Sequence, residues 1–195
     1  TARFISRHLY SFFVSDEPPV PEWRYTSPAN PEAIDQLTRV YFDSNYDISA
    51  MLRVLFNSDY FQSEDSWYSK VKSPVELVAG VLRLTGEFNR PRREIIDRYF
   101  QASYMGQFLN NPPSVEGWHQ GTDWLDTGTL VERVNFASQQ IGDSDKPGIR
   151  EMIERISSIP DNVATPENLI RVCLEEMGVI SVEDDTMKVL MDFVS

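Results

Sequence analysis

The residues best suited to chemistry lie in one irregular stretch, residues 110–130, which reads NNPPSVEGWHQGTDWLDTGTL. It brings together two tryptophans, one histidine and three carboxylates, namely Trp118, Trp124, His119, Glu116, Asp123 and Asp126. Indole faces stack on sugar rings or fill a gap in a core. The carboxylates can accept hydrogen bonds from hydroxyl groups, bind a hard cation, or act as an acid and base pair. These six residues form the candidate ligand-binding site, and we assign no catalytic residue among them.

The same stretch also has a structural interpretation. The proline pair at 112–113 ends the preceding helix, because the residue before a proline is pushed out of the helical region. Gly117 and Gly121 let the backbone turn tightly, and Asp126 or Thr127 is well placed to cap the next helix. A loop held together by its own tryptophans would explain these residues without a bound ligand. Long irregular loops inside helical domains are nevertheless uncommon unless they serve a function, so both interpretations stay open.

The sequence lacks sharper catalytic and metal-binding motifs. It holds no phosphate-binding loop, no dinucleotide fingerprint, no H-E-x-x-H and no G-x-S-x-G elbow. With only His8, His119 and Cys173, the chain alone can build neither a disulfide nor a metal site rich in histidine or cysteine. A Ser-His-Asp triad around His119 is formally possible, but no elbow or oxyanion signature supports it. We therefore expect no metal and no cofactor.

The candidate stretch must be positioned by helices, which the sequence marks by their ends. Capping side chains begin five helices, at Asn30, Asp47, Ser73, Thr165 and Ser181. Ser73, Pro74 and Glu76 make a full capping box, and Gly86 is a C-cap. Helical periodicity predicts helices over residues 1–14, 31–45, 48–58, 75–86, 90–110, 128–142, 146–158, 165–178 and 181–195. Residues 58–64 are expected to form a short turn, and alternating strand patterns are nearly absent.

The first helix and the segment after it carry further expectations. An apolar stripe predicts the buried face of this helix, consisting of Phe4, Ile5, Leu9, Phe12 and Phe13. His8 flanks the stripe and is interpreted as a hydrogen-bonded residue at its edge. Residues 15–30 contain four prolines and cannot form a regular helix. We expect an irregular loop that Trp23 and Tyr25 pin to the surface.

The composition indicates a globular protein, since 41% of its 195 residues are apolar and 12% are aromatic. Thirty acidic and 18 basic residues give a net charge of −12, which would repel nucleic acid and an anionic membrane surface. No apolar run approaches the roughly 20 residues that span a bilayer. Residues 142–195 hold 12 acidic and five basic residues. We predict a main helical domain over residues 1–141 and an acidic helical segment over residues 142–195 packed on it.

Three blocks of the chain resemble the C-terminal half of the bacterial family called domain of unknown function 1800. The blocks are TARFISRHLYSFFV, VKSPVELVAGVLRLTG and MGQFLNNPPSVEGWHQGTDWLDTGTLVERVNFA, which follow one another in order within residues 1–141. The resemblance implies a mainly helical protein whose larger N-terminal portion lies outside this chain, from a family whose members are often predicted to be exported. It implies no activity and no catalytic residue. Ser114, His119 and Gln120 stand where the family pattern has asparagine, proline and glycine, so the chain departs from the pattern inside the candidate stretch itself.

We therefore expect an all-α protein. It would be an irregular multi-helix bundle of about eight to ten helices, with one long loop containing proline, glycine and tryptophan and a C-terminal three-helix segment. The leading hypothesis is a non-catalytic interaction or scaffold role in a larger bacterial protein. Its partners would be the missing N-terminal portion of the same protein, another protein or a glycan, and not nucleic acid. The alternative hypothesis is a carbohydrate-binding or carbohydrate-active site in residues 110–130, and whether the protein is an enzyme stays open.

Overall fold

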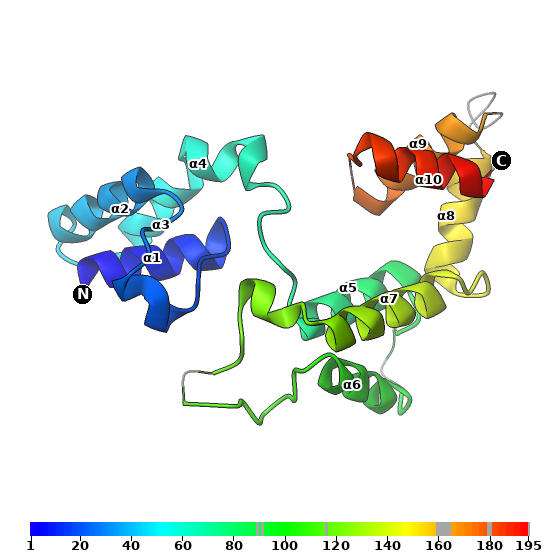
Figure 1. The fold of residues 1–195 in the computed structure, drawn as a ribbon, viewed down its shortest axis with the longest axis horizontal. Helices are drawn as coiled ribbons and strands as arrows, with labels where there is room; N and C mark the ends of the chain where they lie inside the picture. Colours follow the sequence, from blue (N-terminus) through cyan, green and yellow to red (C-terminus); the bar gives the residue numbers. More distant parts are fainter. Residues whose placement is uncertain (89, 91, 116, 159–164, 179–180, 195) are drawn as a thin grey trace. The chain divides into compact units, whose positions relative to one another are not determined.

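The computed structural model describes residues 1–195 apart from 89, 91, 116, 159–164, 179–180 and 195. Over these described residues the chain forms ten α-helices, three short 3₁₀ helices and no β-strand (Figure 1). One isolated antiparallel bridge joins Ser114 to Gly117. The predicted all-α class is confirmed.

Helices follow one another with irregular connections along the whole chain. The α-helices are α1 (Ala2–Phe13), α2 (Pro31–Asp43), α3 (Ile48–Phe56), α4 (Asp59–Gln62), α5 (Pro74–Thr85), α6 (Ile95–Tyr104), α7 (Thr127–Ile141), α8 (Pro147–Ser157), α9 (Pro166–Gly178) and α10 (Asp184–Val194). The 3₁₀ helices are η1 (Val20–Arg24), η2 (Glu64–Ser66) and η3 (Gly121–Trp124). A helix therefore overlaps every range predicted to be helical, and the segment expected to form a short turn contains the short helix α4.

The chain packs as two compact units. The first unit consists of residues 1–78 and 96–134, and the second consists of residues 79–95 and 135–195. The candidate stretch, residues 110–130, belongs to the first unit. The division into residues 1–141 and 142–195 remains a prediction.

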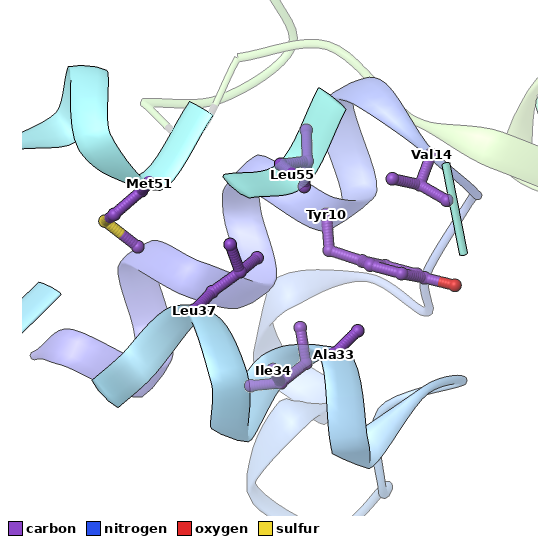
Figure 2. Close-up of a cluster of buried hydrophobic side chains, with 7 residues drawn as sticks. All are labelled: Tyr10, Val14, Ala33, Ile34, Leu37, Met51 and Leu55. Atoms are coloured by element: carbon purple, nitrogen blue, oxygen red, sulfur yellow. The ribbon is translucent and has the colours of Figure 1, made fainter. Parts of the chain in front are cut away.

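The hydrophobic core of the first unit is built by α1, α2 and α3. Seven buried side chains form this core: Tyr10, Val14, Ala33, Ile34, Leu37, Met51 and Leu55 (Figure 2). Ile34, Leu37, Met51 and Leu55 have no exposed surface. Burying one such side chain stabilises a fold by about 1.5–3 kcal/mol. The packing against α2 and α3 therefore fixes the position of α1, whose other side borders the candidate site.

The buried face of α1 differs from the predicted stripe. The buried residues of this helix are Ala2, Ser6, Arg7, Tyr10 and Ser11. Phe4 is 50% exposed and Phe12 is 71% exposed, so the prediction was wrong for these two residues. The other three members of the stripe are half-buried against the core. The helix buries Arg7 instead because this cation has an ion-pair partner inside the unit, which an apolar pattern does not indicate.

Most of the predicted helix caps are confirmed. Asn30, Asp47 and Thr165 each accept a hydrogen bond from a backbone amide two or three residues later, at 3.0, 2.8 and 3.3 Å. Ser73 and Glu76 form the expected reciprocal pair: the Glu76 carboxylate accepts from the Ser73 amide at 2.8 Å, and the Ser73 hydroxyl accepts from the Glu76 amide at 3.4 Å. These local bonds fix where α2, α3, α5 and α9 begin.

Two helices begin later than predicted. Helix α6 begins at Ile95, after the charged residues 92–94, which bury no apolar face. Helix α10 begins at Asp184, where the backbone carbonyl of Glu183 accepts the amide of Met187, and not at Ser181. The C-cap of α5 is confirmed, because Gly86 follows that helix with a φ of 64°.

The second unit contains α8, α9 and α10. A close backbone approach joins α8 to the end of α5: a Cβ added at Gly148 would collide with the carbonyl oxygen of Leu84 and lie 2.9 Å from the carbonyl carbon of Thr85. Lys146, which precedes α8, pairs with Glu87 at 3.0 Å. Cys173 is half-buried, and burial raises the pKa of its thiol, as expected for an unreactive cysteine.

Candidate functional site

Trp124 anchors the candidate stretch in the first unit. Its side chain is only 3% exposed, so it fills space in the interior and contributes little surface to the larger of the two hollows described below, which it borders. Its backbone carbonyl accepts a hydrogen bond from the Thr129 hydroxyl at 2.8 Å, which ties η3 to the first turn of α7. Of the two predicted roles for an indole, Trp124 has the structural one.

Asp126 caps α7, as the structural interpretation predicted. One oxygen of its carboxylate accepts the backbone amides of Gly128 and Thr129 at 2.8 and 2.9 Å. Hydrogen bonds from Thr129 and Gly128 lower the pKa of this carboxyl group, because they stabilise its charged form. Asp126 therefore stays ionised and is poorly suited to donate a proton near neutral pH.

Trp118 differs from Trp124, because it is only partly buried. Its indole N–H donates to the backbone carbonyl of Phe108 at 3.3 Å, so the ring is held in one orientation. A tryptophan that is held at one end and open on its face can contact a ligand. The neighbouring candidate, Glu116, lies outside the described residues.

His119 and Asp123 form a loose polar pair on the surface of the loop. His119 Nδ1 lies 4.0 Å from Asp123 Oδ2, and the two side chains are 57% and 43% exposed. This separation exceeds a hydrogen bond. The His119 ring also meets the Trp124 ring edge-on, with centroids 5.9 Å apart at 90°, so the imidazole rests on the buried anchor of the loop.

Two hollows of the first unit meet at this loop. One has a volume of about 730 Å³ and is lined by α1, by residues 70–76 and by residues 117–124. The other has a volume of about 510 Å³ and is lined by Phe4, residues 19–21, Pro113 and Asp123 among others. Five residues line both: His8, Gly117, Trp118, His119 and Gln120. Both volumes are typical of ligand sites, which range over about 300–1,000 Å³.

His8 belongs to this site although the sequence did not predict it. Its ring packs against Phe4, at a centroid distance of 4.4 Å, and against Trp23, at 4.6 Å. Burial lowers the pKa of His8, so its imidazole is mostly neutral at pH 7. His8 was expected to be a hydrogen-bonded residue at the edge of the helix, but its ring makes aromatic contacts instead. Its position beside His119 depends on the fold and is not indicated by the sequence.

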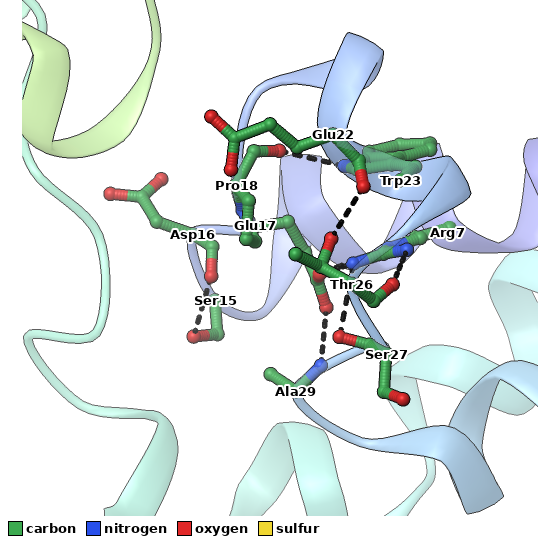
Figure 3. A network of polar contacts seen from close by, with 10 residues as sticks. All are labelled: Arg7, Ser15, Asp16, Glu17, Pro18, Glu22, Trp23, Thr26, Ser27 and Ala29. Atoms are coloured by element: carbon green, nitrogen blue, oxygen red, sulfur yellow. Dashed lines mark hydrogen bonds and ion pairs between the residues drawn. The ribbon is translucent and has the colours of Figure 1, made fainter.

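A buried ion pair (Figure 3) fixes the proline-rich segment, whose Trp23 ring contacts His8. Arg7 donates to Glu17 at 2.9 and 2.6 Å, and the two side chains are 5% and 0% exposed. The Arg7 guanidinium also lies 4.7 Å from the centre of the Trp23 ring. Trp23 therefore pins the proline-rich segment as predicted, whereas Tyr25 is 88% exposed and does not.

Asp16 connects three segments around the larger hollow. Its carboxylate accepts the backbone amide of Val71 at 2.6 Å and pairs with the Lys70 ammonium at 3.1 Å. Gly121 passes close by with a φ of 57°, and a Cβ added there would lie 3.3 Å from Asp16 Cγ. Sequence analysis missed Asp16, because its partners are far away along the chain and no motif marks them.

Two further properties bear on function. Within the described part of the chain, no group of three or more histidine, cysteine, aspartate or glutamate side chains is arranged to hold a metal ion. No described helix has both the length and the apolar character needed to cross a membrane.

The chain was compared with family models, curated proteins and solved structures. A model of the family described as "Protein of unknown function (DUF1800)" matches residues 1–195, which confirms the family that the three sequence blocks resemble. No curated protein and no solved structure matches the chain.

Proposed function

The chain belongs to the DUF1800 family, whose description names no activity, and we propose from the site geometry that it is a non-catalytic ligand-binding domain. Its ligand would lie against Trp118, in the two hollows that share this residue. The domain would thereby serve as an interaction module, and its function would be to bind a partner.

The observation that carries this proposal is the state of the Trp118 ring. A tryptophan used to fill a core is buried, as Trp124 is at 3% exposure, whereas Trp118 is only partly buried and is fixed by its bond to the Phe108 carbonyl. Holding an indole in place before binding lowers the entropy cost of association. Rigid aromatic side chains next to a hollow are also the usual anchors of binding sites.

The carboxylates of the site favour binding over catalysis. An acid and base pair needs two carboxyl groups that face the ligand with different pKa values. Asp126 is engaged by two backbone amides, and these bonds hold its pKa low. Asp123 lies 4.0 Å from His119, too far for the tight hydrogen bond that orients a catalytic base.

A glycan-binding role is the second candidate. The open face of Trp118, with Gln120 and Asp123 near it on the wall of the smaller hollow, has the combination of an apolar plane and polar groups that sugars require. This alternative concerns the same residues and differs only in the ligand.

Arrays of immobilised peptides and glycans, probed with the fluorescently labelled chain, test the proposal. We expect signals that disappear with Trp118→Ala and persist with Trp67→Ala. Trp67 is a suitable control because it belongs to the same unit, is 53% exposed and is not among the residues that line the two hollows. Signals that survive Trp118→Ala would contradict the proposed site. Turnover of a bound compound, lost on changing Asp123, would contradict the non-catalytic role.

A further inference from the structure

We infer that the ligand of the Trp118 site is an extended, basic polypeptide segment with apolar side chains. This inference rests on the proposed function and adds the chemical class of the ligand. Three properties of the two hollows carry it: their charge, the engagement of their polar groups, and their arrangement on either side of one wall.

The charge of the site is negative. Three carboxylates line the hollows, from Asp16, Glu76 and Asp123, against the single ammonium of Lys70. Lys70 is already paired with Asp16 at 3.1 Å, which leaves Glu76 and Asp123 without a lysine or arginine among the lining residues; His119, 4.0 Å from Asp123, is another basic group near them. The net charge of the whole chain, −12, also favours cationic over anionic ligands at long range. The site therefore repels anionic ligands and attracts cationic ones.

Several polar groups of the site already have partners in the protein. Glu76 accepts the Ser73 amide at 2.8 Å, and the side-chain carbonyl of Gln107 accepts the Val75 amide at 2.9 Å. Asp16 uses one oxygen for Lys70 and the other for Val71. A sugar is recognised through many directional hydrogen bonds to its hydroxyl groups, and these engaged groups offer few. Their charges remain, because a hydrogen bond to a carboxylate does not neutralise it.

The apolar walls and the two-part shape favour a polypeptide. Phe12 is 71% exposed in the larger hollow, and Val20, Pro21 and Pro113 line the smaller one. Since Trp118 borders both hollows, a ligand that fills both must be elongated and must cross this ring. An extended chain with apolar side chains on either side of the crossing meets that requirement, and basic side chains can then reach Asp123 and Glu76.

Fluorescence anisotropy with synthetic peptides tests the inference on the complete 195-residue chain. The probe is a fluorescein-labelled peptide of four Lys-Pro-Leu repeats, in which proline favours an extended conformation. The comparison peptides replace every lysine by glutamate or every leucine by serine, and cellohexaose and chitohexaose serve as competing glycans. We expect the Lys-Pro-Leu peptide alone to bind, with an affinity that falls as salt is raised.

Variants separate the contributions of the ring and of the charge. Trp118→Ala should weaken binding at least about tenfold, as expected for a central aromatic anchor. Asp123→Asn should weaken it roughly twofold to fivefold and reduce its salt dependence, whereas Asp65→Asn, an exposed charge of the same unit outside both hollows, should change nothing.

The outcomes that overturn the inference differ from those that overturn the proposed function. Equal binding of the lysine and glutamate peptides, no binding of any peptide at 1 mM (an affinity weaker than about −4.1 kcal/mol), or Trp118-dependent binding of a glycan would each refute a basic polypeptide ligand. The last of these would leave the proposed binding site in place. Peptide binding that Trp118→Ala does not alter would refute both.

Discussion

Arg7 and Glu17 form a buried ion pair in which two guanidinium nitrogens donate to the same carboxylate oxygen. The third guanidinium nitrogen donates to the Thr26 carbonyl at 2.9 Å, and the second carboxylate oxygen accepts the Ala29 amide at 2.8 Å. The pair thus holds the proline-rich segment against α1, including Trp23, whose ring in turn contacts His8. The irregular proline-rich segment is therefore held in place by the ion pair together with its hydrogen bonds to the backbone.

Breaking this pair should destabilise the first unit strongly. Glu17→Gln leaves a buried guanidinium without its counterion, which costs about 3–5 kcal/mol in the free energy of unfolding. Urea unfolding followed by circular dichroism measures the loss. Asp35→Asn is the matched control, since the Arg3–Asp35 pair is 57% and 55% exposed and should contribute at most about 1 kcal/mol. Similar losses in the two variants would show that the burial of Arg7 and Glu17 has no energetic consequence.

Replacing Arg133 should have the opposite effect, because its buried guanidinium has few hydrogen-bond partners. This residue is 8% exposed and donates to the Lys72 carbonyl at 3.0 Å, while Nε and Nη2 have no partner among the described residues. Burial also lowers the pKa of its guanidinium. Replacing buried ion pairs by apolar residues of similar volume is often neutral or stabilises by about 1–4 kcal/mol, and a poorly compensated buried cation should respond in the same direction. We expect Arg133→Met to keep or raise the urea midpoint, in contrast to Arg7→Met, and a loss of more than about 2 kcal/mol would contradict this account.

The sequence predicted what local chemistry decides and missed what tertiary contacts decide. The capping box of Ser73 and Glu76 depends on residues three apart, so it could be recognised in the chain alone. Trp118 was proposed as a ligand contact from the composition of its loop. His8 was not, because its place in the site depends on α1 packing beside a loop more than 100 residues later. The buried face of α1 was misassigned for the same reason, since the partner that buries Arg7 lies outside the helix.

The two tryptophans of the loop should respond differently to truncation. Trp124→Ala removes a side chain that is 3% exposed and should lower the free energy of unfolding by about 3–5 kcal/mol. Trp118→Ala removes a partly buried ring and should cost clearly less, about 1–2 kcal/mol. Thermal unfolding followed by calorimetry compares the two. A loss for Trp118→Ala as large as for Trp124→Ala would mean that Trp118 is a core residue, and would remove the support for the binding site.

The cap of α7 should be sensitive to acid. The pKa of Asp126 is lower in the folded chain than in the unfolded one, so its contribution to stability is present above the unfolded pKa of about 3.9 and is lost as the pH falls through the folded pKa. Asp126→Ala should lower the urea midpoint at pH 7. The difference between wild type and variant should stay constant down to about pH 5 and shrink below about pH 4. A difference that grows on acidification would have the wrong sign for a carboxylate cap.

Gly148 tests the close approach of α8 to the end of α5. Any side chain at this position must displace the backbone near Leu84 and Thr85, because an added Cβ would lie 2.9 Å from the Thr85 carbonyl carbon. We expect Gly148→Ala to destabilise the second unit by about 1–3 kcal/mol, as overpacking usually does. Gly80→Ala is the matched control: this glycine lies within α5, an added Cβ there meets nothing within 4 Å, and the substitution should stabilise by about 0.5–1 kcal/mol. Hydrogen exchange of α8 amides localises the effect, and faster exchange in Gly148→Ala alone is the expected result. Equal exchange in both variants would mean that α8 does not approach α5 as closely as the structure indicates.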